Sequence, residues 1–237
     1  IIDGVNFKVN GGQGSDGQLL TSTGSGVAWE DAPAGGPVFK TFGTNSIMVG
    51  DDATGTINAA NNNTALGVDV FASLTSGDNN VAIGYQALDS NTTGSNNSAV
   101  GSGALGANTS GDYNTAMGLE VLNKNTTGAS NSAFGRETMF RNTTGGYNTA
   151  VGMNALNSNT TANSNSALGF EAMRTNTTGT NNVAVGRESL RSSTTGGTNT
   201  AVGSSAMFTN TTGEQNSVLG HQALYSNTTG SANVVMG

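Results

Sequence analysis

Residues 114–130 read NTAMGLEVLNKNTTGAS, and residues 131–147 read NSAFGRETMFRNTTGGY. The second stretch repeats the first at a distance of 17 residues, with Asn, Ala, Gly, the large apolar residues and the Asn-Thr-Thr-Gly tetrad in the same places. This spacing runs without insertion or deletion from Asn63 to Gly237, which gives ten repeats and a partial eleventh. A gapless period of this kind is typical of solenoids, because each unit must stack in register on the previous one.

We number the 17 places of the repeat from its first Asn. Place 3 is Ala in nine of eleven units (Val218 and Val235 are the exceptions), place 4 is always apolar and place 5 is always Gly. Place 9 is a large apolar residue, and place 13 is Thr in all ten complete repeats. A Gly at place 15 closes the Asn-Thr-Thr-Gly tetrad in nine of ten repeats, Ala162 being the exception.

The composition of the repeat favours short strands and turns. Gly and β-branched residues at this density disfavour a helix. The N-T-A-V-G stretch alternates like a strand, with Thr and the apolar residue of place 4 on one side and Asn and Ala on the other. Asn-Thr-Thr-Gly predicts a turn in which Asn bonds its own backbone and Gly supplies a positive φ. We expect a second short strand around places 8 and 9, and therefore a parallel β-solenoid, or β-roll, with one coil per repeat.

Equivalent residues of successive coils should stack in columns along the axis. Stacked Asn side chains can form amide ladders, and the Gly of place 5 indicates a sharp corner or a close backbone approach. The residues that we expect to form structural columns are Asn114, Ala116, Met117, Gly118, Leu122, Asn125, Thr126, Gly128, Asn148, Ala150, Val151, Gly152 and Leu156.

The apolar content of one repeat is small for an isolated chain. Only two large apolar side chains, at places 4 and 9, are available to a core in every 17 residues. The near-constant Ala offers a small surface against which another chain could pack, so we expect a homo-oligomer, with a trimer as the preferred number. In that arrangement Ala99, Ala116, Ala133 and Ala150 face a neighbouring chain or the fibre axis. Place 2 alternates between Ser and Thr over part of the chain, so the structural unit could also be 34 residues.

The chain divides into three parts. Residues 1–36 predict a small β module ending in a Pro- and Gly-containing linker, residues 37–62 an atypical lead-in, and residues 63–237 the repeats. Within the lead-in, residues 45–50 resemble a degenerate first strand, offset by one residue from the 17-residue spacing. Because the chain begins at Ile1 and stops at Gly237 within a repeat, we expect a processed product or part of a longer polypeptide.

Composition argues against several classes of function. The net charge is −7 with no basic patch, there is no Cys, and no run of about 18 apolar residues occurs. We therefore expect no nucleic-acid partner, no membrane insertion and no disulfide. The single His221 stands at a variable place, so no catalytic triad can be assembled, and we expect neither an enzyme nor a cofactor.

Two recurring patterns have a chemical alternative to their structural interpretation. Four acidic residues share place 7 and could hold a cation, although a solvated column is favoured over a metal site; they are Glu120, Glu137, Glu171 and Glu188. Asn-Thr-Thr is also a glycosylation sequon, although a repeated turn accounts for it better. The sequons begin at Asn91, Asn125, Asn142, Asn159, Asn176, Asn210 and Asn227.

Two segments resemble known families. Residues 14–29, GSDGQLLTSTGSGVAW, resemble a segment common in phage tail and collar fibre proteins. The N-T-A-V-G and N-T-T-G units resemble those of long repetitive virion fibres, which often end in a self-cleaving chaperone domain. They are also distantly similar to the head repeats of trimeric autotransporter adhesins, whose N-S-V-A-I-G units build a trimeric parallel β-roll. The resemblance implies a trimeric virion fibre that projects towards the host cell and contacts other virion proteins through its N-terminal region, with a host surface receptor as a candidate partner.

The sequence leaves three functions open. The first is a structural shaft of a phage fibre at the virion surface, used in host attachment. The second is a bacterial trimeric surface adhesin. The third is an ice-binding solenoid, because regularly spaced Thr columns could order water.

Overall fold

The computed structural model describes residues 18–22, 27–31, 38–40, 47–50 and 60–237, with side-chain surroundings given for residues 60–237. These described residues form strands and turns and contain no helix. The strands β1 (Gln18–Ser22) and β2 (Val27–Asp31) pair antiparallel as a separate two-stranded sheet. The rest of the predicted N-terminal module, and its linker, lie outside the described residues.

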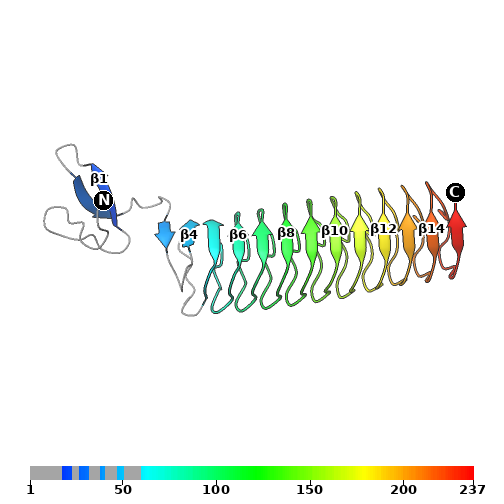
Figure 1. Ribbon diagram of the computed structural model, residues 1–237, viewed down its shortest axis with the longest axis horizontal. Helices are drawn as coiled ribbons and strands as arrows, with labels where there is room; N and C mark the ends of the chain where they lie inside the picture. Colours follow the sequence, from blue (N-terminus) through cyan, green and yellow to red (C-terminus); the bar gives the residue numbers. More distant parts are fainter. Residues whose placement is uncertain (1–17, 23–26, 32–37, 41–46, 51–59) are drawn as a thin grey trace.

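A 13-stranded sheet runs through the repeats, and its order along the sheet is the order of the sequence. It begins with β3 (Val38–Lys40), which pairs antiparallel with β4 (Ile47–Gly50). From β4 onward every pairing is parallel, and the strands β5 to β15 lie side by side in a single row (Figure 1). They are β5 (Thr64–Gly67), β6 (Val81–Ile83), β7 (Ser98–Val100), β8 (Thr115–Met117), β9 (Ser132–Phe134), β10 (Thr149–Val151), β11 (Ser166–Leu168), β12 (Val183–Val185), β13 (Thr200–Val202), β14 (Ser217–Leu219) and β15 (Val234–Met236).

Each 17-residue repeat forms one coil of a parallel β-solenoid, as the period predicted. Ala116 pairs with Ala99 on one side and with Ala133 on the other. Because every parallel pairing joins residues 17 positions apart, the coil is one repeat and not two. The pairing also corrects the expected offset of the lead-in strand: Ile47 lies opposite Thr64, so β4 keeps the 17-residue spacing.

The core of the coil consists of the residues of places 3, 8 and 9. The Ala side chains of place 3 are buried, and so are small residues of place 8 such as Ala104 and Val121. The large residues of place 9 stack above one another and are completely buried in nine coils: Phe71, Leu88, Leu105, Leu122, Met139, Leu156, Met173, Leu190 and Met207. The predicted column of place 9 is therefore confirmed.

The predicted second strand is wrong. Places 8 and 9 lie in a turn, and the residues of place 9 have left-handed backbones, with φ of 50° at Leu122 and 49° at Leu156. This conformation costs about 1–2 kcal/mol in an L-residue. Burial of a Leu side chain returns about 1.5–3 kcal/mol, and the Leu122 amide also donates to the Thr138 carbonyl of the next coil at 3.1 Å. Stacking of the coils thus stabilises a left-handed backbone conformation that Leu on its own disfavours.

Candidate functional site

An amide ladder runs through the interior along the Asn residues of place 1. Asn131 donates from Nδ2 to Asn114 Oδ1 at 3.1 Å and to the Gly145 carbonyl at 2.9 Å. Its own Oδ1 accepts from both the backbone and the side-chain nitrogen of Asn148 at 3.1 Å. These Asn side chains are completely buried, so the ladder satisfies polar groups that would otherwise be costly in a core. The predicted structural role of Asn114 and Asn148 is confirmed.

A second amide ladder follows place 12 and accounts for the sequons. Asn125 Nδ2 donates to Asn108 Oδ1 at 2.8 Å and to the Gly128 carbonyl of its own turn at 2.9 Å. Thr126 Oγ1 donates to the Thr143 carbonyl at 3.0 Å. The sequon side chains from Asn91 to Asn210 are completely buried, so the folded shaft presents none of these to a glycosyltransferase. The turn interpretation of Asn-Thr-Thr therefore agrees with the structure.

The second ladder has one break. Ser193 takes the place of Asn, and its Oγ and the Oδ1 of Asn176 are buried without a hydrogen-bond partner among the described residues. The neighbouring contacts are also longer: Asn176 Nδ2 lies 3.2 Å from Asn159 Oδ1, against 2.7 Å between Asn159 and Asn142. The buried polar groups around residues 176–193 therefore have fewer hydrogen bonds than those of the coils before them.

Glycine is required for different reasons at its two places. Gly118 and Gly152 have φ of +132° and +128°, and an added Cβ would meet the backbone of the next glycine in the column. Both a corner and a close approach are therefore present at place 5, as predicted. Gly128, in contrast, is not among the described glycines with positive φ; its Cβ would meet Asn125 Oδ1 and the Gly145 carbonyl. The positive φ predicted for this turn Gly is wrong, and close packing is the reason for Gly there.

The orientation of the strand corrects the expected docking surface. Ala116 and Ala150 are completely buried within the chain's own coil, so the Ala column does not face a neighbouring chain. Place 4 points outward instead: Met117 is 43% exposed and Leu168 is 50% exposed, and Val151 is half-buried. The outward column contains only apolar residues: Leu66, Ile83, Val100, Met117, Phe134, Val151, Leu168, Val185, Val202, Leu219 and Met236. Sequence reasoning placed both large apolar columns in the core; only place 9 is there.

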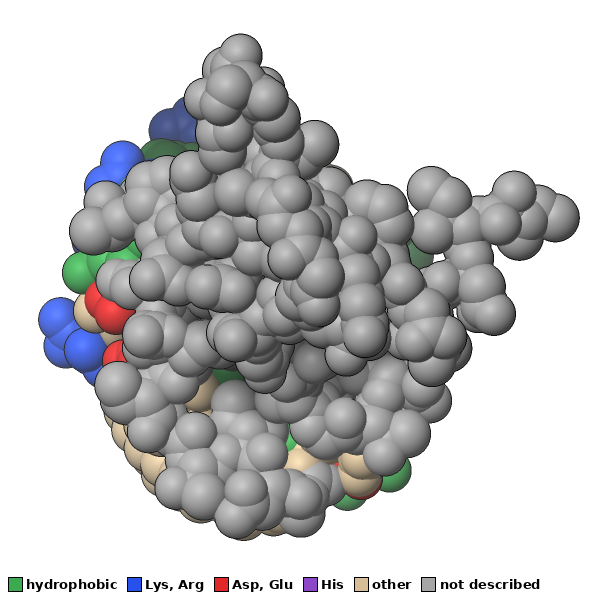
Figure 2. All heavy atoms as spheres, turned by 90° about the vertical axis from the view of Figure 1, so that its left-hand side faces the viewer, with side chains coloured by type: hydrophobic (Ala, Val, Ile, Leu, Met, Phe, Trp, Pro, Cys, Tyr) green, Lys and Arg blue, Asp and Glu red, His purple; other side chains and the backbone are tan. Residues whose placement is uncertain are grey.

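Charged side chains lie on a second surface, the turn edge, which we define as places 6, 7, 10 and 11. All six Lys and Arg residues between 60 and 237 lie on it: Lys124, Arg136, Arg141, Arg174, Arg187 and Arg191. Seen along the shaft from its N-terminal end, the visible basic side chains lie together on one side (Figure 2). Within residues 60–237 the basic residues are therefore collected on a single edge of the shaft.

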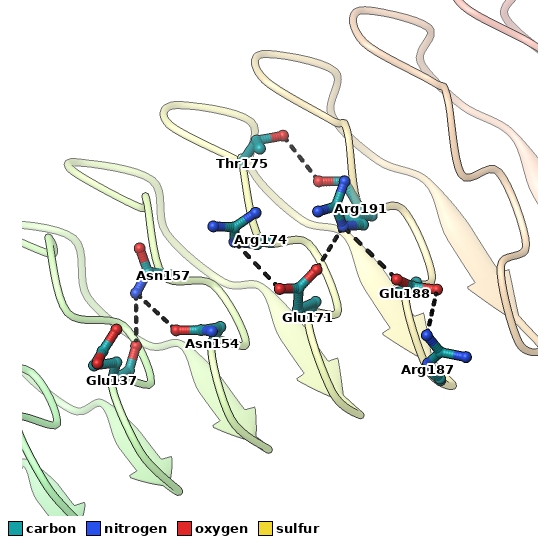
Figure 3. A network of polar contacts seen from close by, with 9 residues as sticks. All are labelled: Glu137, Asn154, Asn157, Glu171, Arg174, Thr175, Arg187, Glu188 and Arg191. Atoms are coloured by element: carbon teal, nitrogen blue, oxygen red, sulfur yellow. Dashed lines mark hydrogen bonds and ion pairs between the residues drawn. The ribbon is translucent and has the colours of Figure 1, made fainter.

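Arginines pair with part of the predicted acidic column. Glu171 contacts Arg191 Nε at 2.6 Å and Arg174 Nε at 3.6 Å, and Glu188 lies 3.4 Å from an Arg187 nitrogen (Figure 3). In the described part of the chain no group of three or more His, Cys, Asp or Glu residues is arranged to hold a metal ion. The Glu171–Arg191 pair joins two neighbouring coils, and the other pairs lie within one coil, so these carboxylates form a surface network of ion pairs.

Aromatic residues extend this network along the edge. Arg191 lies over the Phe208 ring at 5.5 Å, and Phe208 stacks on Tyr225 with ring centroids 5.1 Å apart. His221, also on this edge, is exposed. Equivalent places of successive coils therefore stack cations and rings, and sequence reasoning missed this because it treated the edge only as variable.

No protein-family model, curated protein or solved structure matches this chain. No helix in the described part of the chain could cross a lipid bilayer. The repeat, the outward apolar column and the turn edge are the features of the structure that bear on function.

Proposed function

We propose that this chain is a non-enzymatic structural shaft of a phage tail or collar fibre, located at the virion surface and used in host attachment. The observation that carries the proposal is the gapless stack of coils, in which each repeat adds one coil and lengthens the protein along a single axis. The resemblance of residues 14–29 and of the repeats to fibre proteins supports the virion assignment. We further propose that the N-terminal region contacts other virion proteins, that the fibre acts without nucleic acid, membrane insertion or a cofactor, and that it presents a receptor site to the host.

The outward apolar column supports assembly with two further copies. Eleven strands spaced about 4.8 Å apart, each about 10 Å long, form a strand face of the order of 500 Å². The apolar column of place 4 runs unbroken along this face, and a contiguous exposed apolar stripe is typical of a protein–protein interaction site. The neighbouring outward column, at place 2, contains only Thr, Ser and Val, so identical chains can approach in register without like charges meeting on these faces. Three chains with their strand faces turned to a common axis would cover the stripe along the whole shaft.

Light scattering combined with small-angle scattering on the full chain tests the assembly. Three chains of 23.6 kDa give an elongated particle of about 71 kDa. We expect the triple variant Val151→Glu, Leu168→Glu and Val185→Glu to release chains that keep their β-type circular dichroism. The matched control places the same three charges on the exposed bend of the same coils, as Thr161→Glu, Thr178→Glu and Thr195→Glu, and should remain a trimer. A monomeric native chain would contradict the assembly and leave a single-chain solenoid.

The virion assignment is tested separately. The complete coding sequence and its neighbouring genes would show tail or collar genes for a phage fibre. A secretion signal and a membrane anchor would instead indicate the trimeric surface adhesin and contradict our proposal.

The ice-binding alternative has one structural observation in its favour. The second Thr of the tetrad, such as Thr127, forms an exposed column, whereas the hydroxyl of Thr126 already donates to a backbone carbonyl. Both lie in a bend and not on a flat strand face, which weakens a match to an ordered water layer. A thermal-hysteresis measurement decides this alternative, and we expect no hysteresis.

A further inference from the structure

One coil differs from all the others on the turn edge. In residues 97–113 the three places 7, 10 and 11 are Gly103, Gly106 and Ala107. No other complete coil has small residues at all three places together. Because the coils before and after carry full side chains there, the edge is interrupted by a gap one coil high.

The gap is a recess of about 220 Å³ with walls from three coils. Gln86 and Asp89 line it from the preceding coil, and Asn123 and Lys124 line it from the following coil. Asn123 Nδ2 donates to the Gly103 carbonyl at 2.9 Å, which ties the following coil to the glycine backbone of the recess. The recess is smaller than the roughly 300–1,000 Å³ of pockets for drug-sized ligands, so it suits a single ring.

The recess contains two charged groups, Asp89 and Lys124. Among residues 60–237, neither the Asp89 carboxylate nor the Lys124 ammonium takes part in an ion pair, whereas Glu171 and Glu188 on the same edge are paired with arginines. The Lys124 ammonium nitrogen lies 5.7 Å from the centre of the Phe140 ring, which restricts that side chain. Burial, followed by the charge of Asp69, raises the pKa of Asp89 above its ordinary value. Within residues 60–237 the recess thus presents an acceptor and a donor that are not used in an ion pair.

We propose that this recess binds one neutral sugar residue of a glycan. A hexose ring carries several hydroxyl groups, each of which can donate to a carboxylate and accept from an ammonium or amide group. Asp89 would accept from one hydroxyl, and Lys124 and the amides of Gln86 and Asn123 would supply donors. An anionic ligand would meet the Asp89 charge and a cationic ligand the Lys124 charge, so a neutral polyhydroxylated ring fits the pair best. Gly103 and Gly106 leave the backbone open to a ring lying flat on it.

The site is independent of the virion assignment, because a shaft in any biological setting would keep this recess. It also lies on the turn edge and not on the strand face, so assembly through the outward apolar column does not need these residues. The binding experiment and the assembly experiment can therefore fail separately.

Titration of the full chain with methyl glycosides of neutral hexoses, followed by saturation-transfer NMR and calorimetry, tests the proposal. We expect binding of at least one neutral hexoside, and a loss of affinity of about tenfold or more in Asp89→Ala, since a hydrogen bond to a charged group is removed. The double variant Gly103→Glu and Gly106→Asn should abolish binding by filling the recess.

The filled variant is built to keep the fold. Glu already occupies place 7 at Glu120 with φ of 53°, close to the +67° of Gly103, and Asn already occupies place 10 at Asn123. An added Cβ at Gly103 or Gly106 would lie 3.0 or 3.2 Å from Asn123 Nδ2, so this side-chain amide must shift slightly, and we expect a thermal unfolding midpoint close to that of the native chain. Ser205→Glu, at place 7 of a coil without a recess, is the matched control and should bind as the native chain does.

Three outcomes overturn the proposal. The first is that no neutral hexoside binds the native chain. The second is binding that persists unchanged in the filled variant, which would place the ligand elsewhere. The third is binding of a hexuronate in preference to every neutral hexoside, which would mark an anion site around Lys124.

Discussion

The strand side of each coil, places 1–5, contains residues that never change between repeats, whereas the residues of the turn edge change from coil to coil. In the ten complete repeats place 1 is always Asn and place 5 always Gly, whereas place 6 is Val, Tyr, Ser, Leu, Arg, Met, Phe or His. The difference has a geometric cause. Asn131 bonds residues of the coils on both sides, while the Arg136 side chain is 61% exposed. At place 1, where each side chain hydrogen-bonds its equivalents in the neighbouring coils, one residue is repeated in every coil.

This contrast shows where one coil of a repetitive shaft can differ from the others. A change on the strand side alters a column and affects its neighbours above and below. A change on the turn edge, such as the loss of side chains at Gly103 and Gly106, alters one coil only. The variable edge is therefore the place where a single coil can acquire a separate property.

Replacement of a corner glycine should give the largest effect. In Gly118→Val the side chain would need φ near +132° and would meet the backbone of Gly135. We expect a loss of about 4 kcal/mol or more in the free energy of unfolding, measured by chemical denaturation. His221→Ala, an exposed change on the turn edge, is the control and should alter stability by less than about 0.5 kcal/mol. Equal losses in both variants would show that the two sides do not differ as described.

Removal of one step of the inner ladder should give the second largest effect. Asn131→Ala removes one of the two donors to Asn114 Oδ1 and one of the two donors to the Gly145 carbonyl, and it leaves the Asn148 backbone amide without its acceptor. We expect a loss of about 3 kcal/mol, because these groups are buried. Asn163→Ala provides the matched control, since Asn163 is exposed and accepts a single bond, from the Gly146 amide. A loss in the control as large as that in Asn131→Ala would contradict a special role for the ladder.

Repair of the broken ladder should stabilise the shaft. Ser193→Asn would offer Nδ2 to the unpartnered Asn176 Oδ1 and restore the pattern seen between Asn142 and Asn125 at 2.7 Å. We expect a gain of about 1 kcal/mol, read as a higher midpoint of thermal unfolding. The adjacent Ser192→Asn lies outside the ladder and should give no gain. An unchanged midpoint in Ser193→Asn would mean that the buried groups find other partners.

The smallest expected effect concerns Asp89 on the turn edge. Its pKa in the folded state is raised above the ordinary value of 3.8, first by burial and then by Asp69. The folded chain thus binds this proton more tightly, so the contribution to stability is present at low pH and is lost as pH rises through the raised pKa. Asp89→Asn imitates the protonated form and should stabilise the chain near about pH 7 but not below about pH 3. Thermal unfolding at both pH values measures this, and a gain confined to low pH would reverse the assigned sign.

Much of the architecture could be predicted because repetition amplifies weak local signals. A single N-T-A-M-G stretch is too short to define a strand, but eleven equivalents spaced 17 residues apart allow only stacking in register. The columns of Asn114, Leu122 and Gly118 follow from that register. The ladder role of Asn125 also follows, since an amide repeated along an axis can bond to its own copies.

The direction of each side chain could not be read from the period. Places 4 and 9 are both apolar in every complete repeat, yet Leu122 is completely buried and Met117 is 43% exposed. The turn that carries Leu122 has a left-handed backbone, and this turns its side chain inward where a second strand was expected. Nothing local favours that conformation in Leu, so only contacts with the coils above and below select it.

The sequence by itself determined the coil length, the parallel register and the residues that repeat without exception, because each is a property of spacing. The tertiary structure alone decided which apolar column forms the core, which remains outside, and that Gly103 and Gly106 open a recess between Asp89 and Lys124. These outcomes depend on the curvature of the closed coil and on the space that the side chains of neighbouring coils fill. The spacing of residues along the chain contains no information on either property.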